Sequence, residues 1–503
     1  RGSVDPGDNV TPAGADVAAG SRAIGPGTRL SPREIGLLSA LGRSEVEVRA
    51  RPAVGVVPTG AELVDPGDEV THEIGEIYDV NSHTIAAAVR EAGGHPTVYP
   101  HVGDDTDVLE NALLRAAEEC DLVLSSGSTS AGAGDVVRSV VEAEGDLRIH
   151  GVAVKPGKPT LVGRLGSSGY VGLPGYPVSA LSIFRVFVAP AIRSAAGFGE
   201  PESATIEATM ALAERFSQRR HRYVPVGIVT TGGGETLAYP VDKGSGATTS
   251  LAYADGVVEM PADVEALDAG TSVTVDLFSS DAVSPSLLGV GEDGPVLSRL
   301  LDQIEGARYL SRGSHEGVRL LGEDVPDVAV VSGPTGSDTA VGPETDAESA
   351  ELGGWYREWG IVVPSGNPEA VTGLGDLVDR ELMFVNRGTN SGLRASLDAA
   401  IADLAAERGA ARRDLIAAID GFDRAVPGVE SPARRVEDWR ADAGLGLRAT
   451  AERLGLGFVR LGEERVTVFA NPDRTGKSGT SAMAEAVRSA DGIVDGLPGV
   501  SVD

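Results

Sequence analysis

The stretch DLVLSSGSTSAGAGD, residues 121–135, decides the fold of the first half of the chain. Its apolar residues 122–124 predict a buried strand, and the alternating serines and glycines after them predict a loop. A helix is expected to follow near Asp135. In an open parallel sheet, a loop between a strand and a helix lies at the edge where ligands bind. The stretch therefore predicts an α/β domain with a binding loop.

The same rhythm of strands and helices extends outward from this stretch. Short apolar runs predict strands, and amphipathic runs that end in glycine or begin with an acidic cap predict helices. The predicted strands are 53–58, 96–100 and 121–127, and the predicted helices are 82–94, 105–120 and 181–197. Alternation of this kind predicts a doubly wound, mostly parallel sheet with helices on both faces.

Composition changes along the chain indicate four parts. A small β-rich element is expected at the beginning, short strands between Gly/Asp turns then predict a small β-barrel or sandwich, and alternating strands and helices resume after a linker at 281–286. The predicted domains are 1–51, 52–200, 201–280 and 285–503.

The 503 residues carry a formal charge of −31. This charge argues against a nucleic-acid or anionic-membrane partner, and it is typical of a protein solvated in a salty cytoplasm. Cys120 is the single cysteine, and the seven histidines form no metal-binding pair, so a zinc site is not expected. No apolar run approaches the ~20 residues of a membrane helix.

Two features at predicted strand ends indicate an anion site. The first is the serine–glycine loop, where backbone N–H groups and hydroxyls can surround a phosphate. Its residues are Ser125, Ser126, Gly127, Ser128, Ser130 and Gly132. The second is KPGKP, which holds Lys155 and Lys158 in a chain with only four lysines. A compact ammonium group is well suited to phosphate or another oxyanion.

Carboxylates follow the same strands. Glu62, Asp104, Asp105 and Asp135 could hold a divalent cation beside the anion site. An aspartate after a strand often caps the next helix instead. For Asp105, capping and a direct functional role remain equally open.

Six motifs resemble one family in order and spacing. They are GVVPTGAEL, YDVNS, VGDD, LSSGSTSAGAGD, VAVKPGKPTLVG and GLPGYPVSA, and they resemble the molybdopterin molybdenumtransferase (MoeA) family over about residues 1–280. The resemblance implies that 1–51 is a remnant of further N-terminal domains. It also implies a molybdopterin-binding domain at 52–200, a C-terminal β-barrel domain at 201–280, and a cytoplasmic homodimer.

The resemblance also implies an activity. Family members insert molybdate or tungstate into adenylylated molybdopterin, release AMP and need a divalent cation such as Mg²⁺. The implied catalytic residues are Glu62, Asp104, Asp135 and Lys155, of which the three acids would bind the metal ion. The implied molybdopterin- and phosphate-binding residues are Thr59, Gly60, Ser125, Ser126, Gly127, Ser128, Ser130, Gly132, Lys158, Pro174, Gly175, Pro177 and Ser245. A molybdopterin adenylyltransferase is a possible partner.

The segment 285–503 resembles a two-lobed, type II periplasmic-binding-protein-like domain of the kind allied to LysR effector domains. NRGTNSG and DWRADAGLGLRATAERLGLGFVRL carry this resemblance. Similar modules bind molybdate or tungstate, which implies an oxyanion site. Its expected residues are Ser314, Asn386, Arg387, Ser391 and Gly392.

Two alternatives remain open. The chain could be an adenylyltransferase-like enzyme on the same α/β fold, or a non-catalytic protein that responds to molybdate or tungstate. The run RTGKSGTS, residues 474–481, imitates a nucleotide P-loop, but Asn471 stands where that motif needs glycine. We interpret it as an exposed loop.

Overall fold

The computed structural model describes residues 5–71, 75–103, 105–127, 134–199, 204–241, 244, 246–334 and 350–502, with the backbone alone at 134 and 135. The chain divides into two compact units, Arg1–Glu202 and Ser203–Asp503.

The first unit is built on a six-stranded sheet. Four parallel strands stand side by side, and two antiparallel strands extend the sheet. In spatial order they are β4 (His95–Val98), β1 (Ala53–Pro58), β5 (Leu122–Ser126), β9 (Ser168–Leu173), β8 (Leu161–Leu165) and β6 (Gly145–His150). Nearly all of β1 is buried, because a parallel strand between two helical layers has both faces covered.

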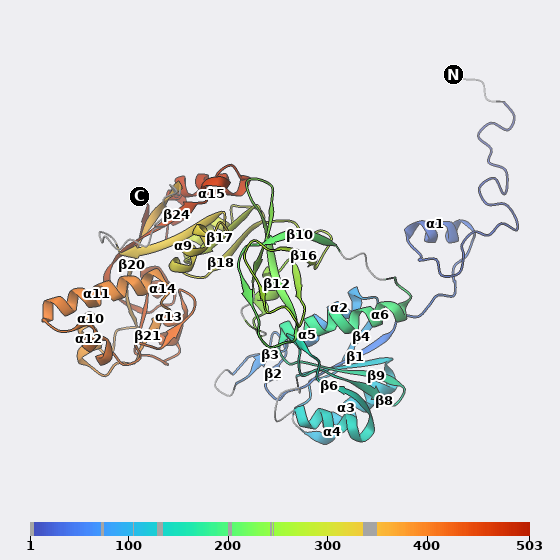
Figure 1. Cartoon of the computed structure of the whole chain (residues 1–503), viewed down its shortest axis with the longest axis horizontal. Helices are drawn as coiled ribbons and strands as arrows, with labels where there is room; N and C mark the ends of the chain where they lie inside the picture. Colours follow the sequence, from blue (N-terminus) through green and yellow to red (C-terminus); the bar gives the residue numbers. More distant parts are fainter. Residues whose placement is uncertain are drawn as a thin grey trace. The chain divides into compact units, whose positions relative to one another are not determined.

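Helices cover both faces of this sheet. Figure 1 shows α2, α5 and α6 on one side and α3 and α4 on the other, which confirms the doubly wound prediction. The helices are α2 (Asn81–Glu91), α3 (Thr106–Glu119), α4 (Gly134–Glu144), α5 (Pro177–Ile183) and α6 (Ala189–Ala196). Leu113, Val123 and Val140 meet in the core beneath α3 and α4.

The predicted helix 181–197 belongs to a helical segment that begins earlier, at Pro177, and is apolar enough to qualify as a membrane helix. Helix α5, the π-helical turn Phe184–Val188 and α6 follow one another without a break over Pro177–Ala196. By length and composition alone this segment could cross a membrane. In this fold Ile183, Phe184 and Ile192 are buried, and the segment packs against α2.

The prediction of a β-rich element at the beginning of the chain is wrong, because the described residues 5–51 form no strand. Their one regular element is α1 (Pro32–Ala40), where the Ser31 hydroxyl and the Glu34 carboxylate form a capping box. The apolar runs around α1 have no hydrogen-bonding neighbour among the described residues, and a strand needs a partner to be stable.

The second unit opens with a closed five-stranded barrel, as predicted. The strands follow the order β13-β10-β16-β14-β12, and β12 pairs with β13 to close the ring. They are β10 (Thr205–Met210), β12 (His221–Thr230), β13 (Thr236–Pro240), β14 (Gly256–Met260) and β16 (Ser272–Leu277). Two short strands, β11 (Glu214–Arg215) and β15 (Ala266–Leu267), pair beside it, and α7 (Thr248–Tyr253) precedes β14.

The rest of the second unit has the two lobes that the sequence predicts. Two long strands, β20 (Ala350–Val363) and β24 (Gly457–Ala470), pair along their whole length and run through both lobes. Lobe A adds β17 (Leu287–Gly291), β18 (Ala307–Ser311), β19 (Val328–Pro334) and β25 (Val500–Val502). Lobe B adds β21 (Phe384–Arg387), β22 (Ala425–Val426) and β23 (Ala443–Leu447).

Each lobe has its own core. The core of lobe A gathers Leu297, Trp355 and Val468, and the core of lobe B gathers Trp359, Phe384 and Leu397. The helices of lobe A are α8 (Pro295–Leu301), α9 (Ser314–Gly322), α15 (Ser478–Arg488) and α16 (Asp491–Val494). Those of lobe B are α10 (Leu374–Asp379), α11 (Gly392–Arg408), α12 (Arg412–Ala418), α13 (Ser431–Glu437) and α14 (Arg448–Arg453), several of which surround β21 in Figure 1.

Lobe A is joined to the barrel by a shared core. Tyr239 of β13 packs in one cluster with Leu288 of lobe A, and that cluster continues through both parts. Arg308, from β18 of lobe A, donates to both carboxylate oxygens of Asp255 at 2.6 and 2.8 Å, and to the Tyr239 hydroxyl at 3.2 Å. The barrel and lobe A therefore pack as one body.

Candidate functional site

The candidate site lies where the parallel strands of the first unit end. Thr59, just after β1, donates from its backbone N–H and its hydroxyl to the Ser126 carbonyl at 2.9 and 3.0 Å. Gly60 donates to the Val102 carbonyl at 2.9 Å. These bonds hold the loops after β1, β4 and β5 together at one edge of the sheet, which we name the strand-end crevice.

Two glycines allow the loops to approach this closely. Gly127 has φ of +129°, and a Cβ atom there would lie 1.9 Å from the Thr59 carbonyl oxygen. A Cβ atom at Gly175, in the loop after β9, would lie 3.0 Å from the Gly127 carbonyl oxygen. A side chain at Gly127 would therefore force the loops after β1 and β5 apart.

Asn81 joins the loops from the side. Its amide nitrogen donates to the Ser126 hydroxyl at 2.8 Å and to the Gly175 carbonyl at 2.7 Å. Its amide oxygen is buried and accepts no hydrogen bond from the described residues. The motif YDVNS drew attention to Asn81, but the predicted binding set omitted it, because its two partners are 45 and 94 residues away in sequence.

The acidic residues have different environments. The Glu62 side chain lies over Gly60. Its carboxylate is exposed and makes no hydrogen bond or ion pair with the described residues. Asp79 is buried and accepts from the Ser82 N–H at 3.0 Å at the start of α2. Asp105 accepts from the N–H groups of residues 107 and 108 at 3.0 and 3.1 Å, which assigns it to capping α3.

KPGKP reaches the same edge of the sheet. It precedes β8, whose first residue Leu161 pairs with Gly172 near the end of β9. The turn is fixed from inside: the Thr160 hydroxyl donates to the Gly157 carbonyl at 2.7 Å, and Gly157 lies against the side chain of Ile183 in α5. Lys155 is half-buried and Lys158 is exposed.

The remaining predicted residues divide between the crevice, the core and the undescribed segments. Pro174 is buried directly after β9, and Pro177 begins α5. Ser125 is buried with its hydroxyl 2.6 Å from the Tyr170 hydroxyl, so this contact favours a structural role. Outside the described residues lie Asp104, Ser128, Ser130, Gly132, Ser245 and the Asp135 side chain.

Of the three acids implied as metal ligands, Glu62 is the one whose side chain the structure describes. An exposed carboxylate without a protein partner is a ligand that Mg²⁺ accepts. No group of three acidic, histidine or cysteine side chains is close enough to hold a metal within the described ranges, which omit Asp104 and the Asp135 side chain. When bound, a divalent cation would neutralise phosphate charge and polarise the bond to be broken.

The predicted oxyanion residues of the C-terminal part also come together, but around a side chain of this chain. Ser314 of lobe A donates to the Glu292 carboxylate at 3.0 Å. From lobe B, the Ser391 hydroxyl and the Gly392 N–H donate to it at 2.9 Å each. Arg387 lies 3.3 Å from the same carboxylate. We name these four donors the anion cradle.

Two further buried residues complete this network. Arg357 of β20 pairs directly across the sheet with Glu464 of β24, at 2.6 and 2.7 Å. Its guanidinium also lies 4.0 Å from Glu292. The sequence analysis missed Glu292, Arg357 and Glu464. Glu292 could have been found, because it directly follows the fully apolar strand β17 at the expected ligand edge.

The prediction that Asn386 belongs to the anion-binding residues is wrong. Its side-chain nitrogen donates to the Phe422 carbonyl at 3.0 Å, and its side-chain oxygen accepts from the Arg387 N–H at 2.8 Å. It fixes the backbone from which Arg387 projects. Its role is therefore to position the loop.

The two buried glutamates differ in their electrostatics. Burial by itself would raise the pKa of Glu292, but the charges of Arg357 and Arg387 and the cradle hydrogen bonds outweigh burial, so this pKa lies below its usual value. For Glu464, burial dominates and raises the pKa above its usual value. Glu292 is therefore held as a carboxylate.

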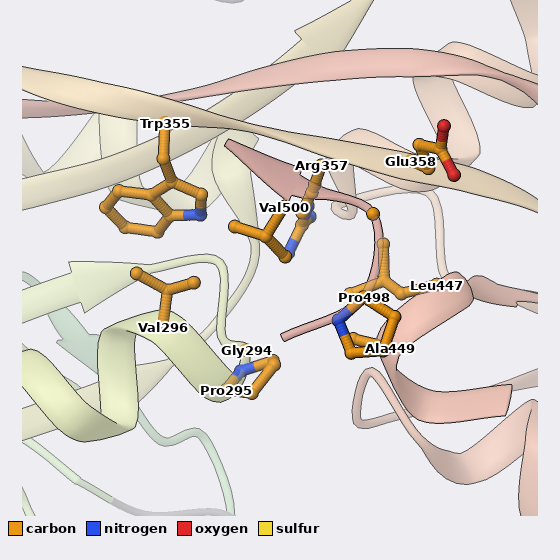
Figure 2. Close-up of a pocket in the computed structure, with 11 residues that line it drawn as sticks. Gly294, Pro295, Val296, Trp355, Arg357, Glu358, Leu447, Ala449, Pro498 and Val500 are labelled. Carbon is orange, nitrogen blue, oxygen red and sulfur yellow. The ribbon is translucent and has the colours of Figure 1, made fainter. Parts of the chain in front are cut away.

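A small pocket lies beside this network, between the lobes. Figure 2 shows Trp355 and Arg357 from β20 on one side, Pro295 and Val296 from α8 below them, and Ala449 of lobe B opposite. Its lining is mostly apolar, so it does not itself form an anion site.

The P-loop-like run at 474–481 is occupied by internal contacts. Lys477 donates to the Asp327 carboxylate at 2.7 Å, and Arg474 is fully buried against the same carboxylate. The lysine of this run is therefore already paired with a carboxylate of the same chain. The interpretation as an exposed loop is wrong at Arg474, and α15 begins within the run at Ser478.

Three protein families match consecutive parts of the chain. Residues 55–194 match the family described as probable molybdopterin binding domain. Residues 207–278 match the MoeA C-terminal region (domain IV), and residues 300–488 match the PBP superfamily domain. The fold and these matches thus define an α/β protein whose first domain matches the probable molybdopterin binding domain family and which carries two further domains.

Two curated relatives and one solved structure are similar to parts of this chain. The chain is 37% identical over 286 residues to molybdopterin molybdenumtransferase 2 of Mycobacterium tuberculosis, which covers 55% of this chain and 68% of the relative. It is 35% identical over 192 residues to the molybdopterin molybdenumtransferase of Haemophilus influenzae, covering 38% of this chain and 47% of the relative. The molybdopterin biosynthesis moeA protein from Pyrococcus horikosii aligns at 38% identity over 50% of this chain and 61% of that structure, with a TM-score of 0.44.

The chain belongs to the molybdopterin molybdenumtransferase (MoeA) family, a family of transferases in molybdenum cofactor biosynthesis. It spans less than two thirds of the Haemophilus and Pyrococcus relatives. Its C-terminal part is a PBP-like domain fused to the MoeA C-terminal region.

Proposed function

We propose that this chain inserts molybdate or tungstate into adenylylated molybdopterin and releases AMP. The observation that carries the proposal is the convergence of strand-end loops through Thr59, Ser126, Gly127 and Gly175, with Asn81 bonded across them. A crevice of close backbone approaches at the carboxyl ends of parallel strands is suited to a phosphate-bearing ligand.

Each group in the crevice is given a role under this proposal. Lys155 and the serine–glycine loop hold the phosphates and the metal oxyanion, because an ammonium group and backbone N–H groups stabilise negative charge. Glu62, Asp104 and Asp135 hold Mg²⁺ and direct the attack on the phosphoanhydride. In that step an oxygen nucleophile forms a bond to phosphorus, the phosphoanhydride P–O bond breaks and AMP leaves. The two dithiol sulfurs then bind molybdenum in place of one molybdate oxygen, which leaves as water with the two thiol protons, so molybdenum keeps its oxidation state.

The assembly and location are also proposals. The chain acts as a cytoplasmic homodimer, with a molybdopterin adenylyltransferase as a possible supplier of its substrate. Its domains are 1–51, 52–200, 201–280 and 285–503. The charge of −31 supports a solvated protein with no nucleic-acid or membrane partner.

A pair of neighbouring aspartates tests the active-site assignment. Asp104→Asn should lower AMP release from adenylylated molybdopterin, Mg²⁺ and molybdate by at least about 100-fold, since it removes a charge assigned to the cation site. Asp105→Asn is the matched control, because asparagine caps helices about as well as aspartate, and it should leave the rate unchanged. Equal rates for the two variants would contradict the assignment.

The substrates distinguish the competing activities. AMP release that depends on molybdate supports insertion, whereas pyrophosphate formation from ATP and molybdopterin would instead identify an adenylyltransferase. No turnover of either kind by the intact chain, with molybdate binding alone, would support a non-catalytic protein.

For the C-terminal part we propose binding of molybdate or tungstate as oxyanions. Two hydroxyls, one helix N-terminal N–H and one arginine converge there, and this donor set suits a small oxyanion. Calorimetry with molybdate, tungstate and sulfate tests this role on the native full chain and on a full chain in which alanine replaces Glu292, the side chain that occupies these donors. No saturable heat with either protein would contradict the role.

A further inference from the structure

The anion cradle already contains an anion, the side chain of Glu292. This carboxylate is buried and accepts hydrogen bonds from the Ser314 hydroxyl, the Ser391 hydroxyl and the Gly392 N–H. Arg387 and Arg357 lie at 3.3 and 4.0 Å. These are the contacts that a protein makes to a bound anionic ligand.

The donors come from both lobes, so the carboxylate connects them. Glu292 follows β17 in lobe A, and Ser391 and Gly392 begin α11 in lobe B. Around it the lobes are in close contact: a Cβ atom at Gly392 would lie 2.0 Å from the hydroxyl oxygen of Ser332 in β19. The same loop of lobe B contacts lobe A again where the His315 N–H donates to the Asn390 carbonyl at 3.2 Å.

The charges show what would follow if the Glu292 carboxylate were absent. Arg357 is paired with Glu464, whereas Arg387 has Glu292 as its nearest acidic partner at 3.3 Å and a second, Asp293, only at 3.9 Å. Arg387 is more than nine-tenths buried, and its Nη1 atom has no hydrogen-bond acceptor among the described residues. A cradle without Glu292 would therefore present a buried positive charge and three unsatisfied donors to any small anion.

We propose that Glu292 is a built-in ligand: its carboxylate fills the anion cradle, holds the two lobes closed and excludes external anions. A small carboxylate or oxyanion binds the cradle only when the Glu292 side chain is removed or displaced. The inference deepens the proposed oxyanion-binding role and rests on it only for the identity of the external anion.

Three versions of the full chain test the proposal. Glu292→Ala empties the cradle, whereas Glu292→Gln keeps it filled with a neutral side chain of the same shape. Each is measured by calorimetry and thermal unfolding with sodium formate, sodium acetate and sodium molybdate, against sodium chloride at equal ionic strength. The native chain and Glu292→Gln should bind none of these anions.

Glu292→Ala should unfold about 5 °C below the native chain, because the buried arginine loses its partner. Formate or acetate should restore most of that loss, with an affinity at least about tenfold above that of the native chain. Glu369→Ala is the matched control, since Glu369 is half exposed and pairs with Arg380 at the surface. Formate should not stabilise this control.

The outcomes separate the two proposals. If the native chain binds molybdate as tightly as Glu292→Ala, the built-in ligand is refuted, although an oxyanion role stands. If Glu292→Ala binds formate but not molybdate, the built-in ligand stands and the oxyanion role fails. If Glu292→Ala folds only when refolded with formate, the proposal is supported, and if formate neither restores folding nor binds, it is refuted.

Discussion

Gly127→Ala should open the strand-end crevice and lower turnover. Gly127 has φ of +129°, which side-chain-bearing residues adopt only with strain of about 1–3 kcal/mol. The added Cβ atom would also lie 1.9 Å from the Thr59 carbonyl oxygen, whereas real Cβ contacts essentially never fall under 3.0 Å. The loops after β1 and β5 must therefore separate by roughly 1 Å.

Both effects have expected sizes. A loss of about 2 kcal/mol lowers the Tm of a unit of this size by about 6 °C. A displacement of about 1 Å between groups that position a substrate can lower the rate by about 100-fold. The thermal unfolding curve and the rate of AMP release from adenylylated molybdopterin measure the two effects separately.

Gly103→Ala is the matched control in the same crevice. A Cβ atom at Gly103 would meet only the Ala61 side chain at an ordinary 3.8 Å, and its φ is not in the left-handed region. We expect its Tm to change by less than about 2 °C and its rate to stay near the native value. If Gly127→Ala behaves like Gly103→Ala, the convergence of loops is not what positions the substrate.

Three further predictions concern other contacts. Asn81→Ala removes both side-chain bonds that join the crevice loops, and should cost about 1–2 kcal/mol in thermal unfolding together with part of the turnover rate; unchanged stability would contradict the geometry. Arg308→Met leaves the buried Asp255 carboxylate without its cation and should cost about 3–5 kcal/mol, and the double variant with Asp255→Asn should recover part of the loss in a double-mutant cycle. The pKa of Glu292 lies below its usual value, so its contribution to stability is present above about pH 4.5 and is lost as the pH falls below that value. The Tm advantage of the native chain over Glu292→Gln should therefore shrink as the pH falls below about 4.5, and a constant difference would refute the ionised carboxylate. The charge of Glu292 also helps to raise the pKa of Glu464, so the difference between the two proteins includes the changed titration of Glu464.

Local patterns were sufficient to predict the doubly wound sheet. The run at 121–127 contains β5, and the apolar run at 53–58 is β1 residue for residue. These strands are buried, and their burial is the property that hydrophobic patterning reports. The length of β20 and β24 was not predicted, because pairing between two strands about 100 residues apart extends each beyond its own apolar core.

The site could be predicted only in part. Rules for strand ends correctly place Thr59, Gly127 and Gly175 in one crevice, since the carboxyl ends of parallel strands share an edge. They cannot tell which of two adjacent hydroxyls faces the core, and Ser125 points to Tyr170.

The rules for strand ends also cannot tell which ligand a set of hydrogen-bond donors binds. The hydroxyls and the arginine of lobe B predict an anion, but the anion is Glu292, whose partners are 22 to 100 residues away in sequence. The position of Glu292 after a strand could mark it as a candidate, but no local pattern shows that it binds these distant donors.

The core shared by the barrel and lobe A has a consequence for dissecting this fusion. A cut near residue 285 would expose Leu288 and Tyr239 to water on the two sides and would leave Asp255 without Arg308. Neither fragment would keep its native surface, and both would tend to self-associate through the bared apolar area. The PBP-like domain is therefore a structural part of the fused protein, and truncation would disturb both parts. Point substitutions in the full chain are the cleaner way to assign the role of this domain.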